Sequence, residues 1–285
     1  MTAARKIETT DETVEARPIV KSAGGKAKLV PKLLEHVPPK FGTFFEPFVG
    51  GAAMYFALAE RARKVVLGDA NTPLMRMYMG VRDDVDTVIA LLRKMPYRET
   101  FYYAQRKKQR KDGFERLNDA EVAAWFIYIN KAGYNGLWRV NKKGQCNVPF
   151  GRYTNPTICD EPNLRAVSAL LKRTRAGLRI GDFEKTVKTA VRGDLVYFDP
   201  PYVPTSTTAD FTSYTADGFT LNDQTRLRDV ALALKKRGVH VVLSNADVPT
   251  VRKLYAGFKL RHVKVQRAIN SDPDKRGDVG EVIIT

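Results

Sequence analysis

The chain has 285 residues, 44% of them hydrophobic, which is enough for one large α/β domain with an insertion or for two modest domains. Its 48 lysines and arginines outnumber 31 acidic residues, and the formal net charge of +17 predicts a polyanionic partner or an anionic membrane surface. No run of about 18 apolar residues and no apolar N-terminal core occurs, so we expect neither a membrane-spanning helix nor a signal peptide. Two cysteines and three scattered histidines show no spacing typical of a disulfide framework, a metal site or a Ser-His-Asp hydrolase.

The periodicity of apolar residues predicts alternating strands and helices with one interruption. Ahead of the interruption we expect strands over 43–48 and 64–68, and helices over 52–63 and from 72 to about 93. The stretch from 99 to 175 is mainly helical, for example over 119–130, and contains a Gly- and Asn-rich segment over 133–153. After it we expect strands over 177–180, 194–198, 239–243, 260–265 and 281–284. Thr220, with Asp223 three residues later, predicts the capped start of a helix whose buried stripe is Leu227, Val230, Ala231 and Leu234.

This pattern is typical of an α/β protein with a Rossmann-like doubly wound sheet and a mostly helical insertion. We expect a flexible tail over residues 1–17, a catalytic domain formed by 18–98 and 176–285, and an inserted domain over 99–175. Each of two basic clusters, taken singly, is typical of a solvated helix face, but together with the net charge they favour phosphate contact. The clusters are Arg106, Lys107, Lys108, Arg110 and Lys111, and Lys172, Arg173, Arg175 and Arg179.

An acid, two prolines and a tyrosine follow the apolar strand over 194–198. Since proline cannot donate to a sheet ladder, the strand must stop there, at the carboxyl edge where open α/β sheets bind ligands. The Asp199 carboxylate and the Pro200 carbonyl can accept both hydrogen bonds of an exocyclic amino group, and Tyr202 can stack on the ring that carries it. We interpret Asp199-Pro200-Pro201-Tyr202 as the amino-methylation motif of a nucleic-acid methyltransferase. The alternative is a turn that merely ends the strand.

Three other strand tips suit one nucleoside. The turn over 46–51 has two glycines that permit close backbone approach, without the Gly-x-Gly-x-x-Gly or Gly-Lys-Ser/Thr pattern of dinucleotide and phosphate loops. Asp69 ends the next strand, where an acid can take two ribose hydroxyls. Asp182 can accept from an adenine amino group, and Phe183 can pack on the adenine ring. Each tip alone could be a plain loop, but all of them together with the Asp199 tip predict a nucleoside site.

Five segments resemble the Dam family of DNA adenine-N6 methyltransferases, of class alpha and D12 type, and the resemblance covers about residues 18–285. It implies S-adenosylmethionine as methyl donor, S-adenosylhomocysteine as product, no metal, and duplex DNA as substrate, most often at GATC. The matching segments are Val20-Lys21-Ser22-Ala23-Gly24-Gly25-Lys26, Phe45-Glu46-Pro47-Phe48-Val49-Gly50, Asn130-Lys131-Ala132-Gly133-Tyr134-Asn135-Gly136-Leu137-Trp138-Arg139, Asn147-Val148-Pro149-Phe150-Gly151-Arg152-Tyr153 and Asp199-Pro200-Pro201-Tyr202.

The resemblance also implies roles by position. The donor site would comprise Ser22, Lys26, Glu46, Phe48, Gly50, Asp69, Asp182, Phe183 and Asp199, which also borders the target. The DNA-binding residues would be Lys21 at the first guanine, Tyr134, Asn135, Leu137 and Arg139 in the opened duplex, and Asn147, Pro149, Arg152 and Tyr153 along the DNA. Ser22 stands where the best-known members have Trp, so we expect weaker donor binding or more stacking on Phe183.

Several alternatives fit the sequence. The amine could be cytosine N4, an RNA base or a glutamine side chain, although Asp199 favours adenine, because cytosine-N4 enzymes usually have Ser there and glutamine enzymes Asn. A catalytically silent DNA-binding protein is a further reading. The segment over 203–218 is a lid or a plain surface loop, and 244–247 has a supporting role. We expect a monomer without a membrane partner, located in the bacterial cytoplasm with the nucleoid or encoded by a phage. A solitary methylase and a restriction-modification partner both fit.

Overall fold

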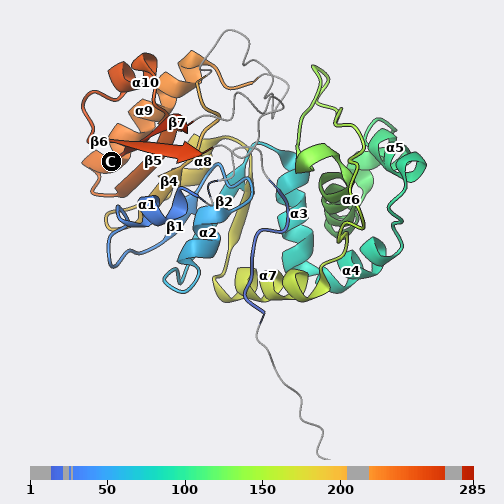
Figure 1. Ribbon diagram of the computed structural model, residues 1–285. Coiled ribbons are helices and arrows are strands. Elements are labelled where there is room, and N and C mark those ends of the chain that lie inside the picture. The colour runs from blue at the N-terminus through green and yellow to red at the C-terminus, as the bar shows by residue number, and fades with distance from the viewer. Residues whose placement is uncertain (1–13, 22–25, 27, 204–217, 267–277) are drawn as a thin grey trace, which may run out of the picture.

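One mixed sheet organises the protein (Figure 1). The computed structural model describes residues 14–21, 26, 28–203, 218–266 and 278–285, and within these ranges seven strands pair in the order β3-β2-β1-β4-β5-β7-β6. The first five of that order are parallel, whereas β7 is antiparallel to β5 and β6. The strands are β1 (Phe44–Glu46), β2 (Val65–Asp69), β3 (Gly177–Ile180), β4 (Leu195–Phe198), β5 (His240–Ala246), β6 (Leu260–Gln266) and β7 (Asp278–Ile284).

The strand order reverses at β1 and β4, which are neighbours although about half of the chain, residues 47–194, lies between them. The carboxyl ends of these two strands therefore border the crevice where doubly wound sheets bind ligands. The Rossmann-like doubly wound fold predicted from the sequence is confirmed.

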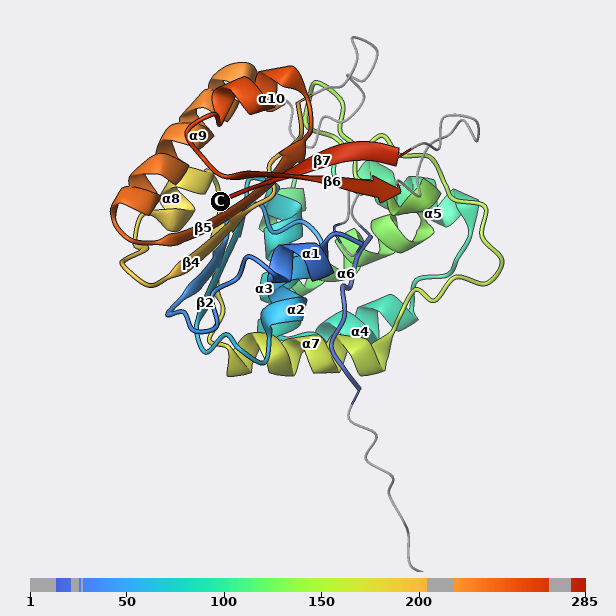
Figure 2. The same ribbon diagram turned by 60° about the vertical axis from the view of Figure 1, so that its left-hand side comes forward.

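Successive residues of the strands face opposite sides of the sheet, and both sides are buried. Phe44 and Leu195 pack into one hydrophobic cluster, whereas Phe45 and Val196 pack into another. One side is covered by α1 (Val30–Leu34), α2 (Ala53–Leu58) and α3 (Thr72–Asp83), and the other by α8 (Phe183–Val187), α9 (Leu221–Lys236) and α10 (Pro249–Leu254) (Figure 1, Figure 2).

The insertion between β2 and β3 stands beside α3, on the far side from the sheet (Figure 1, Figure 2). Its central helix, α6 (Asp119–Ala132), is buried nearly all round and begins with a capping box between Asn118 and Glu121. Because α6 packs on α3, the core of the insertion is continuous with one side of the sheet. Besides α3 and α6, the chain between β2 and β3 contains α4 (Val85–Arg93), α5 (Glu99–Lys108), η1 (Phe114–Arg116), η2 (Tyr134–Gly136) and α7 (Glu161–Arg173).

Several predicted boundaries were wrong. The single helix expected from 72 to about 93 is two helices, because Asp84 leaves helical geometry (φ −144°, ψ 60°) and its side chain caps α4 by accepting from the Thr87 amide. The helix expected over 52–63 ends at Leu58. The first strand ends at Glu46, two residues before its predicted end, because Pro47 follows and cannot donate to the sheet. Val230 is only half-buried, unlike the rest of the predicted stripe. The capping box at Thr220 and Asp223 is confirmed.

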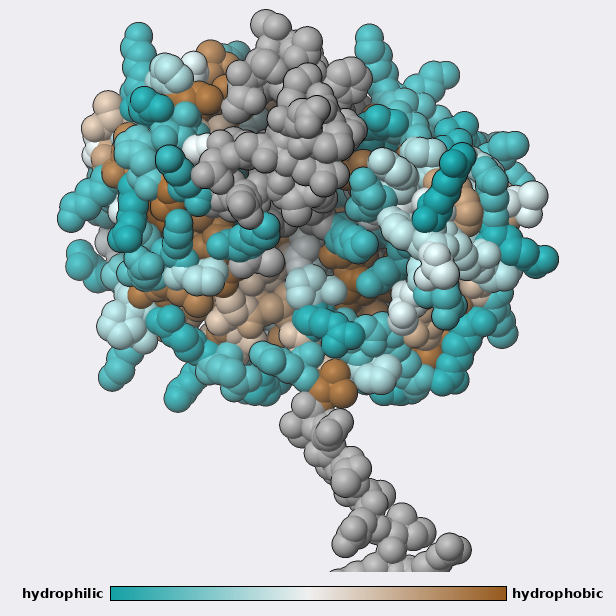
Figure 3. Space-filling view, in the orientation of Figure 1, coloured by the Kyte–Doolittle hydropathy of each residue, from teal (hydrophilic) through white to brown (hydrophobic). Residues whose placement is uncertain are grey.

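Three predictions involve residues outside the described ranges: Ser22, the tail up to residue 13, and 204–217 of the lid or loop segment. Arg17, the last residue of the predicted tail, is anchored by hydrogen bonds to Asn163. Among the described helices, none combines the length and the apolar character needed to cross a membrane. Hydrophilic residues cover most of the face shown in Figure 3.

Candidate active site

Asp199 lies immediately after β4, and two neighbours approach the same carboxylate oxygen. The Lys26 Nζ is 3.0 Å from Asp199 Oδ1, and the Ser244 hydroxyl on adjacent β5 donates to that oxygen at 2.9 Å. The hydroxyls of Tyr197 and Ser244 are 2.9 Å apart, and since the Ser244 proton goes to Asp199, Tyr197 donates to Ser244. Burial raises the pKa of Asp199, and the Lys26 ammonium opposes that shift. The arrangement orients a carboxylate that is harder to ionise than an ordinary Asp.

Tyr202 is fixed at both its ring and its hydroxyl. The Lys26 Nζ lies 4.5 Å from the centre of its ring, and its hydroxyl donates to Glu281 Oε2 on β7 at 2.9 Å. While Lys26 keeps this contact, a planar ligand that stacks on Tyr202 would need the opposite face of the ring. The sequence reasoning missed Glu281, which is buried. A glutamate directly before the apolar run Val282-Ile283-Ile284 was the signal that the sequence offered, because a charge in a buried strand usually has a partner.

The backbone of the tetrapeptide is held by a buried amide pair. Gln224 on α9 donates to the Pro201 carbonyl at 2.8 Å, and Asn245 on β5 donates to Gln224 Oε1 at 3.0 Å. Both amides are almost fully buried. Gln224 was also missed by the sequence reasoning, yet it precedes Leu227 by three positions and so continues the buried stripe of α9.

The tips of β1 and β2 are bonded to each other. Asp69 accepts from the Gly50 amide through Oδ2 at 3.1 Å and from the Asn71 amide through Oδ1 at 2.9 Å. Glu46, only 2% exposed, accepts from the Tyr55 amide of α2 at 3.0 Å, and burial raises its pKa well above the ordinary value. These contacts fix the turn after β1, where Gly50 has a left-handed φ of 45°.

Aromatic rings stack beside this turn. The Phe48 and Phe183 ring centroids are 5.3 Å apart at 28°, and the Phe219 ring meets Phe48 edge-on at 5.7 Å. Asp182 caps α8 and also pairs with Arg226 at 2.7 Å, and the Arg226 guanidinium lies 4.7 Å from the Phe183 ring centre. The sequence did not indicate that Phe219 and Arg226 would join this group.

The predicted DNA-binding residues gather around one irregular segment, 134–153. Arg139 Nε donates to Asn147 Oδ1 at 2.8 Å, so the guanidinium is held by another residue of the same segment. Lys21 reaches the segment from outside, with its Nζ 5.4 Å from the ring centre of Tyr153. Tyr134, at 46% exposure, is a large hydrophobic side chain open to solvent. Asn135, Pro149 and Arg152 are exposed as well, while Leu137, Arg139, Asn147 and Tyr153 are half-buried.

Some members of the two basic clusters have partners within the protein. Arg106 on α5 and Arg110 just after that helix donate to the carbonyls of Val148 and Cys146, so they brace the 134–153 segment. In the second cluster, Arg173 pairs with Glu60, and Arg175 precedes β3. Arg175 therefore lies at the amino-terminal edge of the parallel strands, opposite the edge that bears Asp199.

The strand order is consistent with a Rossmann-like methyltransferase fold, and Asp199-Pro200-Pro201-Tyr202 follows β4 at its switch point. The family model for the D12 class N6 adenine-specific DNA methyltransferases matches residues 22–269, and the chain belongs to this family. The protein is therefore an adenine-specific DNA methyltransferase, as the sequence predicted. Across the described ranges, no three His, Cys, Asp or Glu residues gather so as to hold a metal ion.

Curated relatives extend over nearly the whole chain. The type II methyltransferase M1.LlaDCHI of Lactococcus lactis subsp. cremoris is 39% identical over 95% of this chain and 96% of its own length. The type II methyltransferase M.MjaIII of Methanocaldococcus jannaschii is 41% identical over 93% and 96%. The DNA adenine methylase of Escherichia coli K12 is 35% identical over 94% of each chain.

Proposed function

We propose that this protein transfers a methyl group from S-adenosylmethionine to N6 of an adenine flipped out of duplex DNA, at GATC sites. The observation that carries the proposal is the half-buried Asp199 carboxylate at the end of β4, oriented by Ser244 and sharing the Lys26 ammonium with the ring of Tyr202. A carboxylate, a carbonyl and an aromatic face in one crevice match the amino group and ring of an adenine.

The donor would lie along the tips of β1, β2 and β3. The stacked rings of Phe48 and Phe183 offer an apolar wall for an adenine, and Asp182 lies at the start of α8 beside them. Asp69 would take the ribose hydroxyls, at the cost of sharing oxygens that already accept from the Gly50 and Asn71 amides. The carboxyl groups of buried Glu46 and half-buried Asp199 suit a positively charged ligand. When bound, the donor supplies a methyl group carried on a sulfonium.

The chain's own residues would prepare the target amine. Asp199 and the Pro200 carbonyl accept its two N–H bonds, which localises on nitrogen the lone pair otherwise delocalised into the ring. Tyr202 stacks on the base, and Gln224 keeps the tetrapeptide in place through the Pro201 carbonyl. As the new N–C bond forms, the nitrogen becomes positive and loses one proton, and the Asp199 carboxylate is positioned to receive it. Positioning and fixed charges would provide most of the rate.

DNA reading is assigned to the 134–153 segment together with Lys21. Arg139, held by Asn147, would present its fork to guanine O6 and N7 in the major groove. Tyr134 and Leu137 would replace the stacking lost when the base flips. We accordingly propose that residues 99–175 act as the target-recognition domain and that 18–98 and 176–285 form the catalytic domain.

The test is methylation of plasmid DNA that lacks N6-methyladenine. The protein is incubated with the plasmid and S-adenosylmethionine, and the product is cut with one nuclease that methylated GATC blocks and one that requires it. Resistance to the first and cleavage by the second are expected. If neither pattern changes but nucleoside analysis finds N6-methyladenine, the site is not GATC, and if none is found, the proposed reaction is wrong.

A further inference from the structure

Asn130, near the end of α6, is a buried amide whose bonds all go to backbone groups outside the helix. Only 1% of the residue is exposed to solvent. Oδ1 accepts from the Lys21 amide at 2.9 Å, while Nδ2 donates to the Lys21 carbonyl at 2.9 Å and to the Gly136 carbonyl at 2.8 Å. One amide therefore joins the N-terminal segment to the start of the 134–153 segment.

Lys21 and Gly136 are also in direct contact at this junction. A Cβ added to Gly136, whose φ is 60°, would lie 2.6 Å from the Lys21 Cβ, so the Lys21 side chain lies against Gly136 at a distance that only a glycine allows. The Tyr153 ring lies near the end of the Lys21 side chain, and the Tyr153 hydroxyl donates to the Gly133 carbonyl at 3.0 Å. The position of Lys21 is thus set by the segment that bears Arg139.

Lys21 is followed five positions later by Lys26, which contacts Asp199. Through a single side chain, Asn130 therefore ties the segment proposed to read bases to the part of the chain that also bears Lys26.

We propose that Asn130 is a positioning residue for recognition of the DNA site, because it fixes the Lys21 backbone next to Gly136 and so sets which site is methylated. The inference rests on the proposed function, because it requires that Lys21 and the 134–153 segment read DNA. The pattern of bonds needs one acceptor and two donors, which a side-chain amide supplies and a carboxylate does not. Asn130→Asp keeps the shape and the Lys21 amide bond, but it turns a carboxylate oxygen toward two carbonyls.

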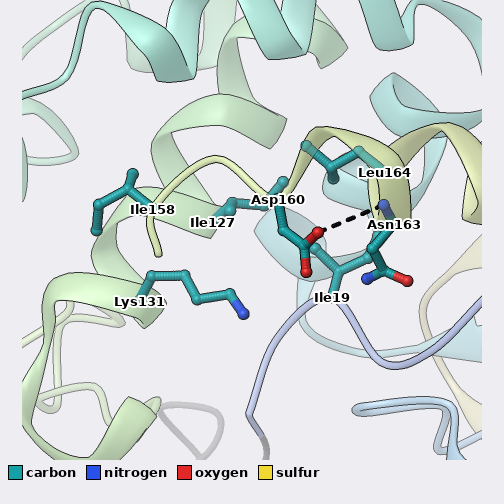
Figure 4. Close-up of a pocket in the computed structure, with 7 residues that line it drawn as sticks. All are labelled: Ile19, Ile127, Lys131, Ile158, Asp160, Asn163 and Leu164. Atoms are coloured by element: carbon teal, nitrogen blue, oxygen red, sulfur yellow. Dashed lines mark hydrogen bonds between the residues drawn. The ribbon is translucent and has the colours of Figure 1, made fainter. Parts of the chain in front are cut away.

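The chain contains a matched control. Asn163 on α7, 2% exposed, clamps the same N-terminal segment in the same manner: Oδ1 accepts from the Arg17 amide at 2.9 Å and Nδ2 donates to the Arg17 carbonyl at 3.1 Å. It lines a small pocket with Ile19, Lys131 and Asp160, whose Oδ1 caps α7 (Figure 4). No described bond of Asn163 reaches the 134–153 segment, so Asn163→Asp perturbs the clamp without touching Gly136.

The experiment measures single-turnover methylation by the full chain on a duplex with the parent's site and on duplexes with one base pair of that site replaced. Calorimetry of S-adenosylmethionine binding and thermal melting accompany each variant. For Asn130→Asp we compare the methylation rate on the parent's site with the rate on a duplex in which the base pair nearest Lys21 is replaced. We expect the ratio of these two rates to fall about tenfold or more. The affinity for S-adenosylmethionine should stay within about twofold of the parent. Asn163→Asp is expected to lower the melting temperature to a similar degree and to keep the parent's ratio.

A second pair of variants covers the case in which Asn130→Asp does not fold. Gly136→Ala presses on Lys21 from the opposite side, and Gly113→Ala has the same kind of backbone strain, at φ 97°, with nothing within 4 Å of the added Cβ. Only Gly136→Ala should lose discrimination. Equal ratios in Asn130→Asp, Gly136→Ala and the parent would overturn the inference while leaving the proposed function intact. A parent that forms no N6-methyladenine would overturn the proposed function, and the inference with it.

Discussion

Lys26 and Asp199 form a nearly buried ion pair, with Nζ 3.0 Å from Oδ1 and only 8% of Lys26 exposed. Burial raises the pKa of Asp199, and the ammonium is the strongest influence that lowers it again. The pair therefore sets the pH below which the carboxylate is protonated and can no longer accept both the target N–H bond and the released proton.

We expect Lys26→Met to move the acid limb of the methylation rate to higher pH. Without the ammonium, desolvation of Asp199 is less opposed, so a larger fraction is protonated at any given pH. Single-turnover rates between pH 5 and 8.5 at saturating donor would measure the shift. Ser244→Ala removes a weaker stabilising contact and should move the limb in the same direction by less. A limb that stays in place or moves to lower pH in Lys26→Met would contradict this assignment.

Asp199→Ala should lower the methylation rate by about 10²–10⁴-fold or more, because the amine loses the acceptor that localises its lone pair. DNA affinity, measured by fluorescence anisotropy on the same duplex, should change little, since the 134–153 segment is untouched. Tyr197→Phe is the milder companion, because it leaves Asp199 in place and removes only the hydroxyl that orients Ser244. Full turnover by Asp199→Ala would rule out the mechanism.

Glu46→Gln should stabilise the protein increasingly as pH rises. Burial raises the pKa of Glu46 in the folded protein, so its contribution to stability is complete below the unfolded value and is lost as pH rises through the folded one. Glutamine still accepts from the Tyr55 amide but never carries the buried charge. Urea unfolding of parent and variant from pH 4 to 8 would give the difference. In exposed Glu60, whose pKa is lowered by Arg173, the same substitution should give a small difference of opposite sign.

Asn147→Ala should weaken discrimination without weakening DNA binding in general. Asn147 holds the Arg139 guanidinium through Nε, and a correctly aimed Arg–guanine contact is worth roughly 1–3 kcal/mol against the wrong base. Methylation rates on cognate and substituted duplexes, together with the dependence of affinity on salt, would separate the two effects. The salt dependence should stay as in the parent, since no phosphate contact is removed. A changed salt slope with an unchanged rate ratio would assign Arg139 to the DNA backbone instead.

The strand tips could be predicted from the sequence because acids, glycines and prolines mark strand ends by their own backbone chemistry. Asp69, Asp182 and Asp199 each lie at or just after the strand end where the apolar pattern placed them. Local chemistry also predicted the Thr220 cap. What it could not give was the helix break at Asp84, since the apolar pattern runs on across it and only the cap geometry shows where one helix ends.

The partners of the site residues could not be predicted, because they come from distant parts of the chain. Glu281 reaches Tyr202 across 79 positions and Gln224 reaches Pro201 across 23, and neither pairing leaves a periodic signal in the sequence. Charge alone was similarly incomplete for Arg106. Its guanidinium donates to a carbonyl of the neighbouring hairpin, and a count of basic residues cannot distinguish that use from phosphate contact.

The pairing of β2 with β3, in which Val66 lies opposite Gly177, has a consequence for how the chain folds. The two strands are neighbours in the sheet, although the whole insertion lies between them in the chain. Closing so long a loop costs conformational entropy before the contacts between the strands can form. The helices α3 to α6 make contacts that are closer along the chain, so we expect them to condense first and shorten the loop. The rate of refolding would then depend on the helical insertion, and slow formation of the sheet would follow it.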